Sequence, residues 1–172
     1  MSNASPLASI AVGVVVERSK SASQWADFYW RPLGVLGGAP ETAPWTKLSD
    51  DGERATFFVG TATIELFRTE SSYYLNNLQS GAPSLWIALR PTGGEPPYTV
   101  GVVTADPAEG EGLTETATDL VEQVPMPEVV RNFVEAFVAE HHVEERFVKR
   151  KRDRADPEAM GRRGPPQRKG HK

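Results

Sequence analysis

Aromatic residues in the first third of the chain are the strongest candidates for ligand binding. The stretch SASQWADFYWRPLGVL, residues 21–36, holds two tryptophans, a phenylalanine and a tyrosine within six positions. Aromatic rings can stack on a flat ligand such as a pterin or a nucleotide base. The rings that could do so, here and on a later pair of predicted strands, are Trp25, Tyr29, Trp30, Trp45 and Phe58.

The same spacing also has a purely structural interpretation, which we favour. Trp25, Phe28 and Tyr29 are three and four positions apart, so their rings would share one face of a helix. Ser21 and Gln24 form a capping box that would start this short helix. A helix laid over a sheet would bury these rings in a core. The sequence therefore predicts a core contact first and a ligand platform second.

Basic residues near the C-terminus could bind an acidic partner. Residues 1–143 carry 8 Lys/Arg and 18 Asp/Glu, whereas residues 144–172 carry 11 Lys/Arg and 5 Asp/Glu. This separation favours electrostatic contacts with another protein or with phosphates, although a tail folding back on its own acidic body is a third possibility. No Phe, Tyr or Trp follows Phe147, so nucleic-acid binding is the less favoured alternative. The residues expected to contact a protein partner are Arg146, Lys149, Arg150, Lys151, Arg152 and Arg154.

The sequence carries no catalytic signature. It contains no cysteine, which excludes disulfides, thiol nucleophiles and Cys-bound zinc. His141 and Glu145 are about one helical turn apart and could share a metal ion, but no third ligand is evident near them. The chain has neither a GxSxG motif nor a P-loop or GxGxxG loop. We therefore predict no catalytic residues, no metal site and no cofactor.

Most of the chain has the pattern of β-strands. IAVGVVVER, residues 10–18, is a β-branched run typical of a central strand. SLWIALRP and YTVGVVTADP predict two further strands, joined by the loop PTGGEPP. TESSYYLNNLQSGAP predicts a short helix ended by its glycine and proline. Residues 106–125 are acidic and threonine-rich, and we expect an irregular surface connection there.

Two turn signals organise residues 45–68. Asp51-Gly52 and Gly60-Thr61 each separate two strand-like runs, which predicts a three-stranded meander. Two-residue turns would place Asp50 opposite Glu53 and would collect the apolar side chains on one face. Trp45 and Phe58 would share the other face.

A C-terminal helix completes the predicted fold. Pro127 and Glu128 are typical of a helix start, and an apolar stripe follows at helical spacing: Val130, Phe133, Val134, Phe137 and Val138. This stripe must pack on the sheet. The prediction is an α+β domain with about seven mainly antiparallel strands in a sheet or small barrel, by analogy with pleckstrin-homology-like folds. A short aromatic N-terminal helix and the packed C-terminal helix would cover it.

Domain limits and location follow from composition. We expect a flexible N-terminus at residues 1–9, one domain at 10–147 and a basic, largely disordered tail at 148–172, which lacks large apolar residues beyond Met160. The first residues lack the basic start of a signal peptide, and no window approaches the roughly 20 apolar residues of a membrane span. The expectation is a cytoplasmic protein without membrane contact.

Several long strings resemble a known family. They are GVVVERSKSASQWADFYWRP, ETAPW, NNLQSGAPSLWIALRPTGGEPPY, VTADPAEGEG, VPMPEVVRNFVEAFVAEHHVE and KRKRDRADPEAM. Together they resemble an uncharacterised bacterial domain family over residues 10–160. Its members are encoded beside molybdenum-dependent formate dehydrogenases and their maturation factors, and some are labelled molybdopterin-guanine dinucleotide biosynthesis protein A.

The resemblance implies a role around a molybdoenzyme. The guanylyltransferase label disagrees with the residues, because ERSKSASQWADF after the first strand has no glycine-rich phosphate loop and the hairpins are antiparallel. We expect a non-catalytic accessory protein that supports maturation or cofactor loading of a formate dehydrogenase-type molybdoenzyme. Its partner would be a molybdoenzyme subunit or a maturation factor. A pterin- or nucleotide-binding protein and tail-mediated nucleic-acid binding are the alternatives.

Overall fold

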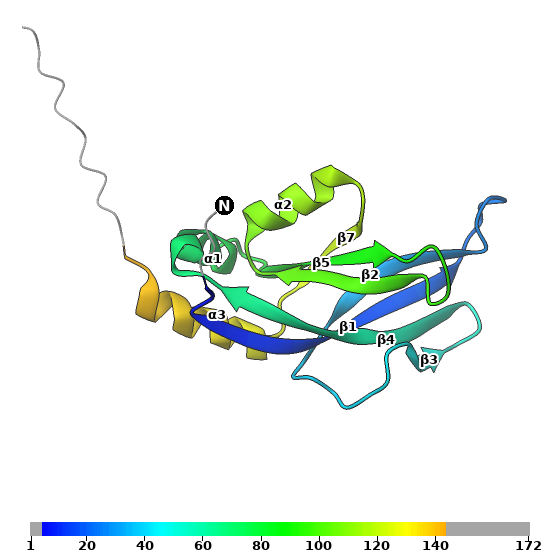
Figure 1. Ribbon diagram of the computed structural model, residues 1–172, viewed down its shortest axis with the longest axis horizontal. Coiled ribbons are helices and arrows are strands. Elements are labelled where there is room, and N and C mark those ends of the chain that lie inside the picture. Colours follow the sequence, from blue (N-terminus) through cyan, green and yellow to red (C-terminus); the bar gives the residue numbers. More distant parts are fainter. Residues whose placement is uncertain (1–4, 144–172) are drawn as a thin grey trace, which may run out of the picture. The chain divides into compact units, whose positions relative to one another are not determined.

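Two antiparallel sheets form the body of the protein in a computed structural model that describes residues 5–143 (Figure 1). The first sheet has the order β2-β1-β4-β3 and the second has the order β6-β5-β7. The strands are β1 (Ala8–Lys20), β2 (Phe28–Gly37), β3 (Thr46–Asp50), β4 (Arg54–Leu66), β5 (Ser84–Pro91), β6 (Tyr98–Thr104) and β7 (Leu120–Pro125). The predicted class, α+β with antiparallel strands, is confirmed.

Three α-helices complete the described region. They are α1 (Ser71–Leu78), preceded by a 3₁₀ turn at Arg68–Glu70, α2 (Pro107–Thr116) and α3 (Glu128–His141). Helices α1 and α3 lie together, whereas α2 covers the second sheet beside β5 and β7 (Figure 1). The short helix predicted in TESSYYLNNLQSGAP corresponds to α1, and the predicted C-terminal helix corresponds to α3.

Four of the five residues in the predicted apolar stripe of α3 are buried, and the fifth, Phe133, is half-buried. Val130 and Val134 are inaccessible to solvent and belong to the same core as the valines of β1 and the leucines of β5. The stripe does not rest on strands alone, because the ring of Phe137 meets Tyr74 of α1 edge-on, with centroids 5.9 Å apart. The helix therefore closes the core against both a sheet and a second helix.

The strands do not close into a barrel. β4 lies beside β6 and β2 lies beside β7, yet no ladder of hydrogen bonds joins either pair among the described residues. The analogy with a closed small barrel is therefore wrong at two seams. At the seam between them, β6 and the second half of β4 each pair on one side only.

Gly60-Thr61 is not a hairpin turn. β4 runs without interruption along β1, and Val14 pairs with Gly60 while Val15 pairs with Phe58. Val59 is thus an extra residue in a β-bulge, and Gly60 adopts a φ of +153°. A glycine with positive φ serves a bulge as well as a turn, so the local signal could not distinguish the two.

The β3–β4 turn exists, but its register differs from the prediction. Asp50 pairs with Ala55 instead of Glu53, and the backbone N–H of Asp51 donates to Arg54 O at 3.0 Å. The pairing then shifts between Lys47 and Ser49, which the two-residue turn rule does not foresee.

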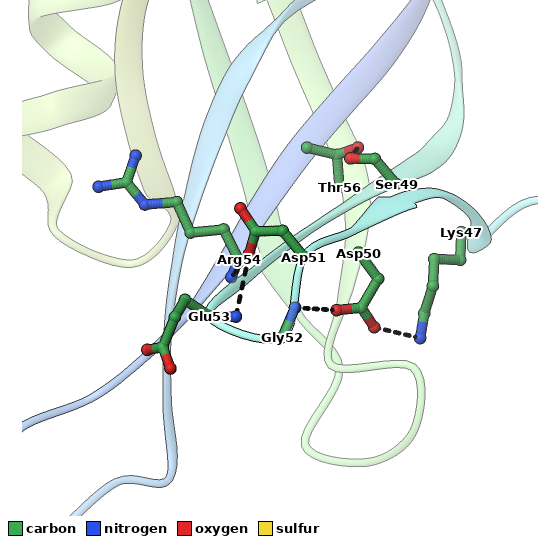
Figure 2. Close-up of polar contacts among 8 residues, drawn as sticks. All are labelled: Lys47, Ser49, Asp50, Asp51, Gly52, Glu53, Arg54 and Thr56. Atoms are coloured by element: carbon green, nitrogen blue, oxygen red, sulfur yellow. Dashed lines mark hydrogen bonds and ion pairs between the residues drawn. The ribbon is translucent and has the colours of Figure 1, made fainter.

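Side-chain acceptors explain this turn (Figure 2). The carboxylate of Asp51 accepts the backbone N–H groups of Glu53 and Arg54 at 2.9 and 2.7 Å, and these bonds lower the pKa of Asp51. Asp50 accepts from Lys47 Nζ at 2.8 Å and from the Gly52 N–H at 3.0 Å, and the bond to Lys47 is the main cause of its lowered pKa. The two aspartates thus set where the chain reverses.

The predicted aromatic helix near Ala22 is absent. Residues 21–27 form a loop, and β2 begins at Phe28, where Lys20 pairs with Phe28 and Arg18 with Trp30. Ser21 and Ser23 each accept a backbone N–H two residues ahead, from Ser23 and Trp25, so they shape a turn instead of capping a helix. Pairing with β1 outweighs the helical spacing.

Residues 106–125 are also ordered, contrary to the predicted irregular connection. Asp106 caps α2 by accepting from the N–H groups of Ala108 and Glu109, and Pro107 occupies the first helical position. β7 then pairs along β5. The residues of the helix cap are evident in the sequence, but α2 is glycine-rich and has no apolar stripe from which a helix could be predicted.

A matched pair of glycines in α2 tests its packing on β5. A Cβ at Gly110 would lie 2.2 Å from the indole of Trp86, whereas a Cβ at Gly112 would meet nothing within 4 Å. We expect Gly110→Ala to destabilise the protein by about 1–3 kcal/mol through overpacking. Gly112→Ala should stabilise it by about 0.5–1 kcal/mol through helix propensity. Urea unfolding measures both, and stabilisation by Gly110→Ala would contradict the packing.

Tyr74 gives a pH-dependent prediction. Burial raises its pKa to about 12, although its hydroxyl accepts the Phe67 N–H at 3.1 Å. Above pH 10 the unfolded chain loses this proton while the folded chain keeps it, so the free energy of unfolding falls until the pH passes about 12. Tyr74→Phe should remove that part of the fall and cost about 1–3 kcal/mol at neutral pH, because the Phe67 N–H loses its acceptor. Urea unfolding between pH 7 and 11 measures both; a difference between the two proteins that does not change with pH would contradict the prediction.

Candidate functional site

The β1–β2 hairpin carries the two most exposed aromatic residues of the described chain, Trp25 and Tyr29, and a third exposed ring, Phe28. Trp25 in its loop is 91% exposed, and Tyr29 and Phe28 at the start of β2 are 58% and 41% exposed. We call these three residues the aromatic arm. In Figure 1 the loop that bears Trp25 (blue, right) lies at the end of the first sheet away from α1 and α3. The rings of the arm do not close a core, so the structural interpretation favoured from the sequence is wrong for them.

Local hydrogen bonds shape the arm. The Ser21 N–H donates to Asp27 O at 3.2 Å and closes the base of the loop. Ser23 Oγ accepts the Trp25 N–H at 3.1 Å, which holds the backbone of the tryptophan in a turn. Trp25 is therefore presented on an ordered loop although its side chain has almost no contact with the rest of the domain.

A second aromatic cluster lies at the base of the arm. It contains Trp30, Trp45, Phe57 and Tyr98, and we call it the aromatic junction. Trp30 and Trp45 meet edge-to-face with ring centroids 5.5 Å apart. Trp45 Nε1 donates to Tyr98 O at 3.2 Å, which ties the first sheet to β6 of the second.

Arg18 connects the arm to the junction. Its guanidinium lies 4.4 Å from the ring centroid of Phe28 and 5.2 Å from that of Phe57. Cation–π contacts of this kind are stabilising even near a surface. The arginine thus fixes the side of the arm that faces the junction. Tyr29, one residue further along β2, points to the other face, where Glu17 and Arg31 form an ion pair at 3.1 Å.

The structure separates the five aromatic candidates into three groups. Trp25 and Tyr29 belong to the exposed arm, and Trp30 and Trp45 meet in the junction. Phe58 is only 2% exposed and lies on the opposite face of β4, where it packs close to Gly13. Trp45 has a φ of +67° and is not extended, so its ring contacts Phe57 instead of sharing a face with Phe58.

Other side chains considered from the sequence have local partners. His141 packs on Phe137 with centroids 4.5 Å apart, and His142 Nδ1 lies 3.4 Å from Ser71 Oγ. Within residues 5–143, no group of three or more His, Cys, Asp or Glu side chains is placed to hold a metal ion. None of the helices in this region is long and apolar enough to cross a membrane. Arg146, Lys149, Arg150, Lys151, Arg152, Arg154 and the whole predicted tail 148–172 lie outside the described residues, so their role stays a prediction.

Sequence reasoning missed Arg18, Phe57 and Tyr98 as parts of this region. Arg18 lies on the same face of β1 as the inward-facing Val14 and Val16, a position at which a cation needs a partner such as an aromatic ring. The place of Arg18 on this face could therefore have been predicted from the sequence. The contribution of Tyr98 could not have been predicted, because it depends on how the second sheet packs against the first.

The described residues form an α+β domain of two antiparallel sheets with a projecting aromatic arm. The chain belongs to the DUF3305 family, described as a protein of unknown function, whose model matches residues 11–151. No curated protein and no solved structure matches the sequence.

The arm and the junction differ in what they contribute to stability. Trp45→Ala removes ring contacts and the bond to Tyr98 O, and we expect a loss of about 2–4 kcal/mol. Trp25→Ala removes an exposed side chain and should change stability by no more than about 0.5 kcal/mol. Urea unfolding followed by far-UV circular dichroism compares the two, and a large loss for Trp25→Ala would mean that the arm is a structural element.

Proposed function

We propose that this protein is a non-catalytic accessory protein that binds a protein partner through the aromatic arm. The partner we propose is a subunit or a maturation factor of a formate dehydrogenase-type molybdoenzyme, whose assembly or cofactor loading the protein supports. The observation that carries the proposal is the exposure of Trp25, which is 91% accessible on a hydrogen-bonded loop.

Aromatic arms are effective binding surfaces for physical reasons. Moving the apolar surface of a tryptophan ring out of water is favourable, so an exposed ring gains free energy when a partner buries it at an interface. Tryptophan, tyrosine and arginine are enriched among the residues that dominate protein–protein affinity. The arm offers Trp25, Phe28 and Tyr29, and Arg31 lies two residues after Tyr29 on the same face of β2. This composition supports a protein partner.

The class of partner rests on the resemblance described above. Members of the resembling family are encoded beside molybdenum-dependent formate dehydrogenases and their maturation factors. The strings that carry the resemblance include SKSASQWADFYWRP, which contains the complete arm. The segment that would make the contact is therefore part of the segment that identifies the family.

A pterin- or nucleotide-binding protein is the second candidate. The contact between Trp30 and Trp45 favours it, because two indoles come together at an accessible position. The rings are inclined at 84° and touch each other, whereas a flat ligand is sandwiched best between parallel rings with a gap. The protein-binding proposal is therefore the stronger of the two.

Affinity capture from the native host tests the proposal. The full chain with an affinity tag should enrich molybdoenzyme subunits or maturation factors, and Trp25→Ala/Tyr29→Ala should lose them, because the anchoring rings are gone. Tyr73→Ala is the matched control, since Tyr73 is an exposed aromatic residue of α1 outside the arm. Quantitative mass spectrometry of the captured proteins gives the amount of each partner recovered by each variant relative to the wild type.

Three outcomes would contradict the proposal. The tagged protein could recover no such partner, the double variant could retain it, or the Tyr73→Ala control could lose it equally. A concentration-dependent rise in the melting temperature with pterins or nucleotides, absent in Trp30→Ala, would favour the second candidate instead.

A further inference from the structure

A concave surface on the second sheet is separate from the aromatic arm. It lies between α2 and β7 and has a volume of about 480 Å³. Trp86 of β5, Val121 and Gln123 contribute to its lining from the sheet, and Glu111 and Glu115 contribute from α2. Trp86 pairs with Gln123 across the sheet, so both side chains lie on the face that α2 covers. We call this surface the acidic groove.

Its carboxylates are unfavourably placed in the isolated protein. Glu111 and Glu115 are four residues apart on α2, where like charges repel. Glu115 also lies in the last turn of α2, at the negative end of the helix dipole. Among residues 5–143, neither carboxylate forms an ion pair. A cation bound in the groove would relieve both effects.

The negative charge around the groove also favours binding of a cation. Residues 106–122, which form α2 and the first part of β7, contain six Asp/Glu and no Lys or Arg. Glu122 of β7 adds a third carboxylate to the lining of the groove. Positively charged groups are therefore attracted to this face over a distance of several ångströms.

Trp86 supplies a second, independent requirement. The residue is 9% exposed, and its indole lies under Gly110 of α2. Within the described chain its N–H has no hydrogen-bond acceptor, yet no side-chain polar atom there is both fully buried and unpaired, so the N–H keeps some solvent access, and the residue lines the groove. An occupant that offers a hydrogen-bond acceptor as well as positive charge would therefore satisfy both features of the groove.

We propose that the acidic groove binds an extended Arg/Lys-rich peptide segment of a partner protein. Side-chain cations pair with Glu111 and Glu115, and a backbone carbonyl of the peptide accepts the Trp86 N–H. A bare metal ion or a polyamine supplies the charge without the acceptor, so a peptide fits both requirements. This proposal does not depend on the function proposed for the aromatic arm.

The test is a binding titration of the full chain with a fluorescein-labelled hexa-arginine peptide, followed by fluorescence anisotropy. We expect saturable binding that becomes at least about 10-fold weaker in Glu111→Gln/Glu115→Gln, which keeps the shape and removes the charge. Trp86→Phe keeps most of the ring and removes the N–H, and should weaken binding about 3- to 10-fold. Melting temperatures of all variants establish that they fold.

Glu41→Gln/Glu95→Gln is the matched control, because it removes two exposed carboxylates elsewhere and gives the same net charge. Its affinity should stay within about twofold of the wild type. An equal loss in this control would overturn the proposal in favour of diffuse attraction to an acidic protein.

Two further results would also overturn it. In the first, Trp86→Phe binds the peptide as tightly as the wild type, and spermine displaces the labelled peptide at the same concentration as unlabelled hexa-arginine does. This result would assign the groove to simple cations. Tighter peptide binding after replacement of the four basic residues 149–152 by Gln would assign the groove to the chain's own basic segment.

Discussion

The pairing of β1 with β4 is the constraint on which the rest of the described structure depends. It runs from Ala8 opposite Leu66 to Ser19 opposite Arg54, with one bulge at Val59. Val12, Val14 and Val16 of β1 are inaccessible to solvent and form the centre of the core. Because β1 also pairs with β2, the same strand places the aromatic arm, and β4 places β3 and the turn of Figure 2.

The second constraint is the contact between the two sheets where strand pairing stops. Ladder hydrogen bonds do not join β4 to β6, so side chains must hold these strands side by side. The aromatic junction does this at one end, through Trp45 and Tyr98. Trp45 needs a left-handed backbone conformation to reach this position, which is uncommon for a residue with a side chain. The ring contacts and the indole hydrogen bond offset that cost.

The two proposed surfaces have opposite chemistry and belong to different sheets. The aromatic arm extends from the first sheet and presents apolar rings near Arg18, Lys20 and Arg31. The acidic groove lies on the second sheet under α2 and presents carboxylates around Trp86. A protein with two such surfaces can hold two different protein segments, which suits an accessory role in assembly. The separation also means that each surface can be altered without disturbing the other.

The sequence by itself determined the elements whose own pattern is sufficient. β1, β5, β6, α1 and α3 were predicted because β-branched runs or an apolar stripe commit a segment to one conformation whatever its neighbours do. The α+β class follows from them. Tertiary structure decided the elements with weak or ambiguous patterns. A bulge formed at Val59 where Gly60-Thr61 predicts a turn, β2 replaced a short helix, and α2 and β7 formed in an acidic stretch. It also decided that Phe57, and not Phe58, faces Trp45. Those outcomes depend on which strand pairs with which, and the free energy of such pairing comes from contacts between residues far apart in the chain.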